Sequence, residues 1–423
     1  MTRRIHRKRR EAVLLVGNFR AALALARPLS KAGYRVITML SSFSAICLSR
    51  HVHDVWWRDS DFSDLPKFVE DLEQYLSSNP DIIGVAPLYQ DLIVALLPYR
   101  DRLSVPLLVS NSEPVSISDD KARLSQLGSE LGLSVAPFAV GNGVQELIEA
   151  CNNVGYPCVF KSKNSLGPRL PILILRNEEQ VRSVAKRLSG KCKNFMVQQL
   201  VGGWRCNRYF IAFRGRVLRH LDIKILRTAR IDDTGLMVSA ISVAPLAKLD
   251  EPTARLIEAL DYSGVGNVQF LVDDSSGENW LLEVNPLTGS SYAFPDYCGG
   301  DLGSALVDIV QNRPLDRWSG AFSYPIGKRF AWLMGDIGGL LWSIERRQVT
   351  PRQALHWLVR ALASGIRADC HSNWAWDDPL PALYLYGRRM TLFALRALHA
   401  VPRIALRRSM NILTGGRRLP TRR

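Results

Sequence analysis

The sequence predicts an α/β domain at the N-terminus, an α+β unit in the middle of the chain, and a helical, basic extension at the C-terminus. Three observations support this prediction. Residues 12–40 show a strand, helix and strand pattern, residues 267–284 show two strands joined by a polar turn, and six of the ten tryptophans follow residue 317 among helical patterns. At 423 residues the chain exceeds the size of a single core, so we expect two or three domains.

The first domain is expected over residues 11–115, behind a basic arm at residues 1–10. A short apolar run closed by Gly17 precedes a helical pattern and a second apolar run, and this order predicts parallel strands joined by a crossover helix. The expected elements are strands at residues 12–16, 34–40, 81–86 and 106–110 and a helix at residues 19–32.

The α+β unit is expected over residues 116–315, and a separate helical, Trp-rich and Arg-rich region over residues 316–423. The unit combines apolar runs of strand length with two amphipathic helical patterns. The expected strands lie at residues 157–162, 195–201, 208–213, 267–272 and 280–284, and the expected helices at 119–131 and 178–188.

The net charge of +16 is located at the two ends of the chain. Residues 1–10 hold six basic residues and no acid, and ten arginines but no acid follow Asp378, so the residues between them balance to zero. A nucleic-acid enzyme would carry its positive charge on the folded body, so we expect no specific nucleic-acid partner. A basic amphipathic pattern at residues 381–410 leaves two alternatives open: a helix packed on the protein, or contact with an anionic membrane surface.

The cysteines and the hydropathy indicate the compartment. The seven cysteines form no C-x-x-C pair and no regular spacing, which fits a reducing environment without disulfides or zinc. No window reaches the roughly 18 apolar residues that a membrane span needs. We therefore expect a cytoplasmic protein, with peripheral contact at the inner face of the membrane as the alternative.

Three polar side chains are expected to converge on the predicted hairpin at residues 267–285. Antiparallel pairing brings Gln269 beside Glu283, and Asn285 follows two residues later on the same face. Hard cations such as Mg²⁺ and Mn²⁺ prefer oxygen ligands and take one or two carboxylates together with nucleotide phosphates. The alternative is an ordinary hairpin with a polar outer face.

The segment NVQFLVDDSSGENWLLEVNP resembles the metal-binding hairpin of the ATP-grasp superfamily, and its NVQF is most similar to the carbamoyl-phosphate synthase large chain. The resemblance covers about residues 116–300 and implies two subdomains that clasp ATP. It also implies that Gln269, Glu283 and Asn285 hold two divalent ions against the phosphates.

Other segments occur in the order of that family, and the resemblance assigns them to the nucleotide. Lys121 and Lys161 are similar to the two lysines that contact it, and a lysine suits a polyphosphate because it is a compact point charge with three donors. The segment FMVQQLVGG resembles the strand and hinge that hold adenine. By this match Gln198 faces the adenine amino group, and the backbones of Gln199 and Val201 read its edge.

Lys224 and Arg227 resemble a cationic cluster near the γ-phosphate, with a charged strand face as the alternative, and Arg169 lies in the segment that matches the loop over the phosphates. Three features depart from the family, and one is this loop, in which Pro168 and Pro171 remove two backbone donors. Arg205 stands where an acidic residue contacts the ribose, and Leu287 replaces an arginine that follows the E-x-N-P element. The second substrate is therefore expected to differ from those of well-studied relatives.

Together these residues predict an ATP-dependent carboxylate-amine ligase. ATP and two Mg²⁺ or Mn²⁺ ions are the expected cofactors, with Lys224, Arg227 and Arg169 as catalytic cations. A small carboxylate and an amine are the expected substrates, and a homodimer is considered. An inactive ATP-binding module and carbamoyl-phosphate-type phosphorylation of a carboxylate are the alternatives.

Overall fold

The computed structural model describes residues 10–17, 19–58, 62, 64–164, 170–286 and 289–388. Most of the basic arm, Arg169, Leu287 and the arginine-rich residues 389–423 lie outside the described residues. Within the described residues there is no helix long and apolar enough to cross a membrane.

The N-terminal unit is built on a parallel sheet. Its strands are β1 (Ala12–Val16), β2 (Arg35–Leu40), β3 (Asp54–Trp57) and β4 (Ile82–Pro87), in the order β3-β2-β1-β4. Every residue of β1 is buried, as expected for a parallel strand covered on both faces. The helices of this unit are α1 (Phe19–Lys31), α2 (Leu65–Ser78), α3 (Gln90–Leu96) and α4 (Ser112–Asp119).

The strand predicted at residues 106–110 is not formed. Leu107 makes a single parallel bridge to Val85, and the chain then bends at residues 108–109 instead of forming a fifth strand. Pro106 supplies the physical reason, because proline has no N–H for a sheet ladder.

A second, smaller sheet is antiparallel and has two helices packed on it. Its strands are β5 (Phe138–Gly141), β6 (Cys158–Ser162), β7 (Leu173–Leu175) and β8 (Phe195–Gln199), in the order β5-β8-β6-β7. The helices α6 (Val144–Val154) and α7 (Glu178–Leu188) contribute their apolar faces to a core of their own, with Phe160 and Phe195 fully buried in it.

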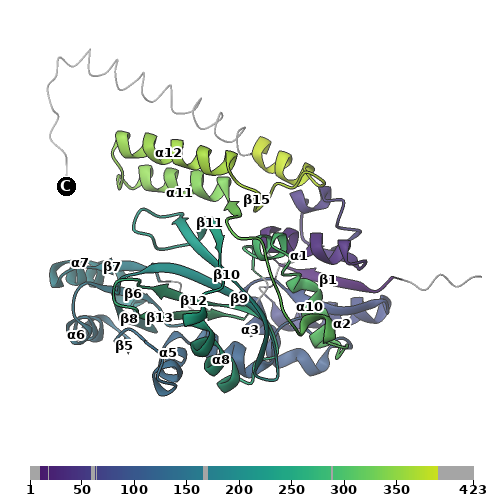
Figure 1. Cartoon of the computed structure of the whole chain (residues 1–423), viewed down its shortest axis with the longest axis horizontal. Helices are drawn as coiled ribbons and strands as arrows, with labels where there is room; N and C mark the ends of the chain where they lie inside the picture. The colour runs from purple at the N-terminus through teal and green to yellow at the C-terminus, as the bar shows by residue number, and fades with distance from the viewer. Residues whose placement is uncertain are drawn as a thin grey trace, which may run out of the picture.

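The third sheet has seven strands, in the order β13-β12-β9-β10-β11-β14-β15. These are β9 (Trp204–Phe213), β10 (Arg216–Thr228), β11 (Met237–Val243), β12 (Gly264–Val272), β13 (Asn279–Asn285), β14 (Arg329–Ala331) and β15 (Cys370–His371). Figure 1 shows the second sheet with α6 and α7 at one end of the molecule, β1 and α2 at the other, and this sheet between them.

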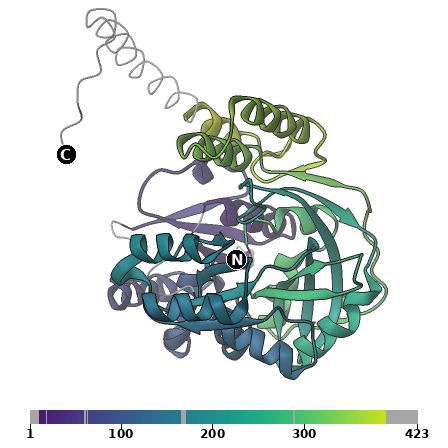
Figure 2. The ribbon, with the colours of Figure 1, turned by 90° about the vertical axis from the view of Figure 1, so that its left-hand side faces the viewer.

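The region after residue 315 contains helices, as predicted, but it is joined to the third sheet. Its helices α11 (Leu333–Glu345) and α12 (Pro351–Ile366) form a layer seen in yellow-green in Figure 2. β14 pairs with β11, and β15 pairs with β14. Strands of three and two residues are too short to give a periodic sequence signal.

The two faces of the third sheet bury different cores. One face packs against α1 and α10 (Leu302–Val310) through Tyr209 and Ile223. The other face packs against α5 (Lys121–Glu130) and α8 (Asp250–Ala259) through Phe210 and Phe270. The remaining helices of the described residues are α9 (Ala293–Tyr297), a helical segment at residues 380–388, and the 3₁₀ turns η1 (Ala45–Leu48), η2 (Leu97–Arg102), η3 (Ser189–Lys191), η4 (Ala247–Leu249) and η5 (Asp316–Trp318).

Candidate active site

A cavity of about 890 Å³ lies between the second and third sheets. Strands β6 and β8 of the second sheet line one side of it, and β9, β10, β12 and β13 of the third sheet line the other. Six of its lining side chains are cationic and three are acidic. The cavity therefore carries a surplus of positive charge, which suits an anionic ligand.

The hairpin of β12 and β13 has the register that the sequence predicted. Gln269 pairs with Glu283, and Asn267 pairs with Asn285, so these side chains occupy one patch of the cavity wall. The tight turn is held by Asp273, whose carboxylate accepts bonds from the backbone N–H and the hydroxyl of Ser275 at 2.9 and 2.6 Å. This turn fixes the register, and the register places the polar groups.

The amide of Asn285 is oriented by its neighbours. Its Nδ2 donates to Glu283 Oε1 at 3.0 Å and to Asn267 Oδ1 at 3.3 Å, which turns its oxygen away from both. Asn207, which pairs with Gln269 from β9, is 4% exposed, and its Oδ1 has no partner among the described residues. A bound water or ion would satisfy such a buried oxygen.

These donors fit a hard divalent cation. Glu283 supplies one carboxylate, and Asn285 and Asn207 supply amide oxygens, which is the ligand chemistry of Mg²⁺ and Mn²⁺. Within the described part of the chain no group of three His, Cys, Asp or Glu side chains could hold a metal ion, so a cation here depends on the amides.

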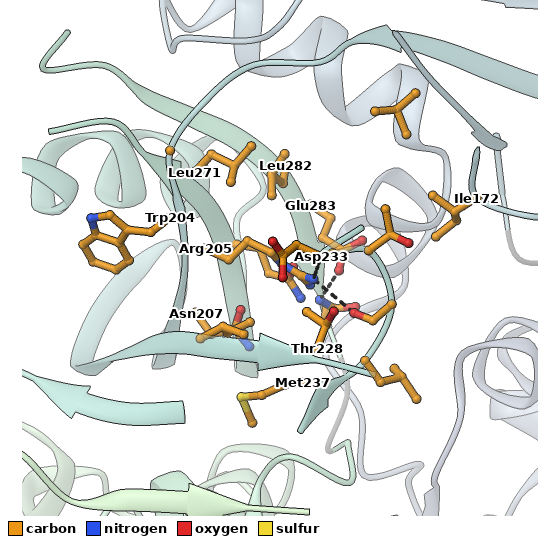
Figure 3. Close-up of a pocket in the computed structure, with 18 of the residues that line it drawn as sticks. Ile172, Trp204, Arg205, Asn207, Thr228, Asp233, Met237, Leu271, Leu282 and Glu283 are labelled. Carbon is orange, nitrogen blue, oxygen red and sulfur yellow. Dashed lines mark hydrogen bonds between the residues drawn. The ribbon is translucent and has the colours of Figure 1, made fainter. Parts of the chain in front are cut away.

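Arg205 occupies the centre of this patch, beside Glu283 and Asp233 in Figure 3. Its Nη2 donates to Gln269 Oε1 at 3.0 Å, and its Nη1 donates to the carbonyl of Gly235 at 3.0 Å. Burial lowers the pKa of this guanidinium, and the charge of Glu283 opposes that shift. The arginine that departed from the family pattern thus contacts the predicted metal ligand.

Lys161 is the second-to-last residue of β6 and faces the cavity from the opposite side. Its Nζ donates to Gln198 Oε1 at 2.9 Å. Burial lowers the pKa of Lys161 to about 8, the carboxylate of Glu283 opposes the shift, and Lys121 at the start of α5 adds to it. Lys161 is thus attracted by Glu283 and repelled by Lys121. A bound polyanion would offset the repulsion between the two lysines.

The strand β8 offers one edge for a planar ligand. The N–H of Gln199 donates to the carbonyl of Pro137 at 2.8 Å, and Pro137 has no N–H to return, so the carbonyl of Gln199 receives no bond from this partner. Gln199 and Val201 both line the cavity, as does Gln198, whose Nε2 bonds the carbonyl of Ala136 at 3.4 Å.

The two cations predicted near the γ-phosphate have different surroundings. The Nζ of Lys224 lies 4.4 Å from the centre of the Trp204 ring. Arg227 also lines the cavity, but its guanidinium forms a two-bond ion pair with Asp336 of α11, and Trp357 of α12 donates to the same carboxylate at 2.6 Å. The charge of Arg227 is therefore compensated from the C-terminal helices.

Sequence reasoning missed four residues of this site. Asn267 lies two residues from Gln269, and Asn207 lies two residues from Arg205, so the alternation along β12 and β9 could have found them. Arg20 of α1 reaches the cavity, bonds Ser290 and lies 3.3 Å from the centre of the Trp332 ring. Asp233 enters from the loop after β10, for which no local signal exists.

The sequence and the fold are both similar to known proteins. A family model described as "Carbamoyl-phosphate synthase L chain, ATP binding domain" matches residues 239–317. The mitochondrial ammonia-dependent carbamoyl-phosphate synthase of Rattus norvegicus is 26% identical over 50% of this chain and 14% of that protein. The large chain from Thermotoga neapolitana is 23% identical over 65% of this chain and 26% of that protein. The chain thus matches only a small part of these relatives.

Among solved structures, the 2-oxoglutarate carboxylase biotin carboxylase domain of Hydrogenobacter thermophilus has a TM-score of 0.60 at 16% identity, covering 75% of this chain and 73% of that one. An N5-carboxyaminoimidazole ribonucleotide synthetase in complex with ADP also has a TM-score of 0.60, at 15% identity over 79% and 85%. The L-amino acid ligase of Bacillus licheniformis has a TM-score of 0.55 at 13% identity, over 72% and 75%. These likenesses show a shared ATP-grasp fold.

Proposed function

Because this chain shares the ATP-grasp fold and part of its sequence is similar to the ATP-binding domain of carbamoyl-phosphate synthases, we propose that it is an ATP-dependent ligase that activates a carboxylate for attack by an amine. The observation that carries the proposal is the cavity in which Glu283 and Asn285 of the hairpin face Lys161 of the second sheet. Polar oxygens on one wall and lysines on the other suit a triphosphate with its cation.

In this proposal the nucleotide lies along the cavity from β8 to the hairpin. The carbonyl of Gln199 and the N–H of Val201 bind the edge of the adenine, while Gln198 holds Lys161 in place. Lys121 and Lys161 then bind the phosphates as point charges. Arg169 is proposed as a further cation over the γ-phosphate on the basis of sequence alone.

The reaction proposed is phosphoryl transfer followed by amide formation. A substrate carboxylate oxygen bonds to the γ-phosphorus as the bond from that phosphorus to the β-phosphate oxygen breaks, which releases ADP and leaves an acyl phosphate. The amine nitrogen then bonds to the acyl carbon, phosphate leaves, and the amine loses a proton. The chain needs no nucleophile of its own, because positioning and charge neutralisation carry such transfers.

Each polar group has a task in this scheme. Glu283 and Asn285, with Gln269 beside them, bind a divalent cation, which supplies neutralisation of phosphate charge when it is bound. Lys224 offsets charge on the transferred group, and its position beside the Trp204 ring limits its rotamers. Arg227 contributes mainly through orientation, because its guanidinium is paired with Asp336.

ADP release on addition of candidate carboxylates and amines tests this function, with the product identified by mass. The Glu283→Ala variant is the control, since it lacks the one carboxylate of the hairpin patch. A condensation product that forms with wild type and not with this variant supports the proposal. ATP-independent product formation contradicts the proposal, and absence of product with every pair of substrates while nucleotide still binds favours the inactive ATP-binding alternative.

A homodimer is proposed as the assembled state. The biotin carboxylase domain that shares this fold is described as a dimer. Light scattering coupled to gel filtration distinguishes a dimer from a monomer of 47.4 kDa.

Contact with an anionic membrane surface is proposed for the arginine-rich residues 389–423, from the sequence alone. Each basic residue near such a surface contributes about 1 kcal/mol. Flotation with anionic vesicles, with and without these residues, tests it, and equal recovery contradicts it.

A further inference from the structure

The guanidinium of Arg205 is built into the hairpin patch as a fixed cation. β9 places the residue opposite Leu271 of β12, with the side chain directed toward Gln269. Two carbonyl oxygens of the loop after β10 hold the same nitrogen atom, Asp233 O at 3.4 Å and Gly235 O at 3.0 Å. These three hydrogen bonds restrict the guanidinium to its position beside Gln269.

The oxygens that Arg205 contacts are neutral. The three bonds of its terminal nitrogens go to one side-chain amide and two backbone carbonyls, and among the described residues its buried Nε has no partner. The charges of Glu283 and Asp233, which both line the cavity, act on the guanidinium, but neither of these two described carboxylates forms an ion pair with it. The positive charge of Arg205 is therefore available to the cavity.

A divalent ion bound to Gln269 would have to lie beside the guanidinium of Arg205. The amide oxygen of Gln269 has two lone pairs, and the bond from Arg205 uses one of them, so an ion bound to the other would lie beside the guanidinium. An ion bound there would also lie next to a positive charge that three oxygens hold in place, in a partly desolvated site where repulsion is strong. Glu283, Asn285 and Asn207 remain for a cation that approaches from the other side of the patch.

We propose that Arg205 takes the place of one of the two divalent ions, so that this site binds a single divalent ion with each nucleotide. This inference rests on the proposed function, since it concerns the ions that accompany ATP there. The resemblance places this position at the ribose, but in the structure Arg205 contacts the predicted metal ligand Gln269, so it acts as the second positive charge on the phosphates. The site should therefore reach full activity at a lower concentration of free divalent ions than a two-ion site needs.

Counting bound Mn²⁺ by electron paramagnetic resonance, at saturating non-hydrolysable ATP analogue, tests the proposal without any turnover. We expect one tightly bound Mn²⁺ per chain in wild type. In Arg205→Met the amide of Gln269 is released, and a second Mn²⁺ should bind at least tenfold more tightly than any second ion in wild type. Arg205→Lys keeps the charge and should bind one.

Arg216→Met is the matched control, because Arg216 is exposed on β10 and does not line the cavity, and it should also bind one ion. Two tightly bound ions in wild type would overturn the inference, and that count needs no variant to fold. A single ion in Arg205→Met would overturn it as well. Failure of the wild type to bind the nucleotide at all would instead remove the proposed function on which the inference depends.

Discussion

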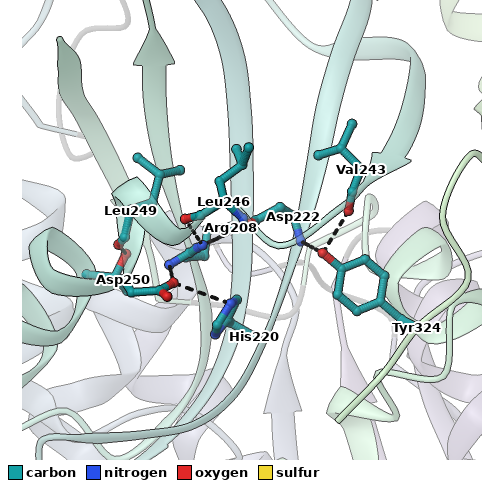
Figure 4. A network of polar contacts seen from close by, with 9 residues as sticks. Arg208, His220, Asp222, Val243, Leu246, Leu249, Asp250 and Tyr324 are labelled. Atoms are coloured by element: carbon teal, nitrogen blue, oxygen red, sulfur yellow. Dashed lines mark hydrogen bonds and ion pairs between the residues drawn. The ribbon is translucent and has the colours of Figure 1, made fainter. Parts of the chain in front are cut away.

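Two arginines of β9, Arg205 and Arg208, lie three residues apart and face opposite sides of the same sheet. Arg208 is 1% exposed and forms ion pairs with Asp222 at 2.7 Å and Asp250 at 2.6 Å, and it also bonds the carbonyl of Leu246 (Figure 4). Asp222 lies directly across from it on β10. Arg205 contacts neutral oxygens instead and faces the cavity.

The charge of Arg208 is neutralised by ion pairs within the fold, whereas the charge of Arg205 faces the cavity with no ion pair in the described part of the chain. Burial alone would lower the pKa of Arg208, and its pairs with Asp222 and Asp250 raise it overall, so this charge is satisfied within the fold. Burial lowers the pKa of Arg205, and the charges of Glu283 and Asp233 offset this only in part. A surplus charge in a cavity costs stability and is retained where a ligand supplies the counter-charge.

The largest effect is expected from breaking the structural pair. Asp222→Ala leaves Arg208 buried without its main counter-charge, which should lower the free energy of unfolding by about 3–5 kcal/mol. Urea unfolding monitored by fluorescence measures this. Asp250→Ala is the control, since that side chain is 53% exposed and its loss should cost only about 0–1 kcal/mol. Equal losses in the two variants would contradict the assignment of Asp222 as the structural partner.

The next effect is expected from Glu283, on the functional side. Glu283→Ala removes the one carboxylate of the hairpin patch and should slow ATP-dependent turnover by roughly 10²–10³ while stability stays nearly constant. Glu278→Ala is the matched control, because Glu278 lies in the turn of the same hairpin, outside the cavity. A comparable loss of rate in both variants would show that the hairpin, and not the carboxylate, matters.

The sequence was sufficient to predict the pairing in the hairpin, because that pairing depends on residues close together in the chain. Gln269 and Glu283 are separated by one turn, and the period of two places both on one face. The partners of Arg205 and Arg227 were not predictable, since they depend on contacts between distant elements: Arg227 pairs with Asp336, which lies 109 residues away. The alternation of residues along a strand gives no information about side-chain pairs between segments that lie far apart in the sequence.

A smaller effect concerns pH, through Lys161. Its pKa of about 8 in the free protein means that the side chain loses its proton as the pH rises through that value. A triphosphate favours the charged form, so binding takes up a proton above about pH 8, and affinity should fall by up to about tenfold per pH unit there. Calorimetric titration with an ATP analogue measures this. Lys161→Arg keeps its charge and should flatten the profile; an unchanged slope would exclude Lys161 as the group that titrates.

The smallest effect is expected at Trp204, whose ring lies beside the Nζ of Lys224. Trp204→Leu removes a cation–π contact of about 0.5–1 kcal/mol, equivalent to a two- to fivefold loss of nucleotide affinity. Lys248→Met is the control, because Lys248 shares the Asp274 partner of Trp204 at the surface and does not line the cavity. Affinity that is lost in the Lys248 variant and retained in Trp204→Leu would reverse this assignment.

The central claim is that the positively charged cavity between the two sheets takes up a nucleotide together with a divalent ion. Calorimetric titration of the wild-type chain with a non-hydrolysable ATP analogue, with Mg²⁺ and with EDTA, tests it most directly. The account predicts one nucleotide per chain with Mg²⁺, and much weaker uptake with EDTA or in Glu283→Ala. Absence of uptake, or uptake that neither EDTA nor the loss of Glu283 alters, would contradict it.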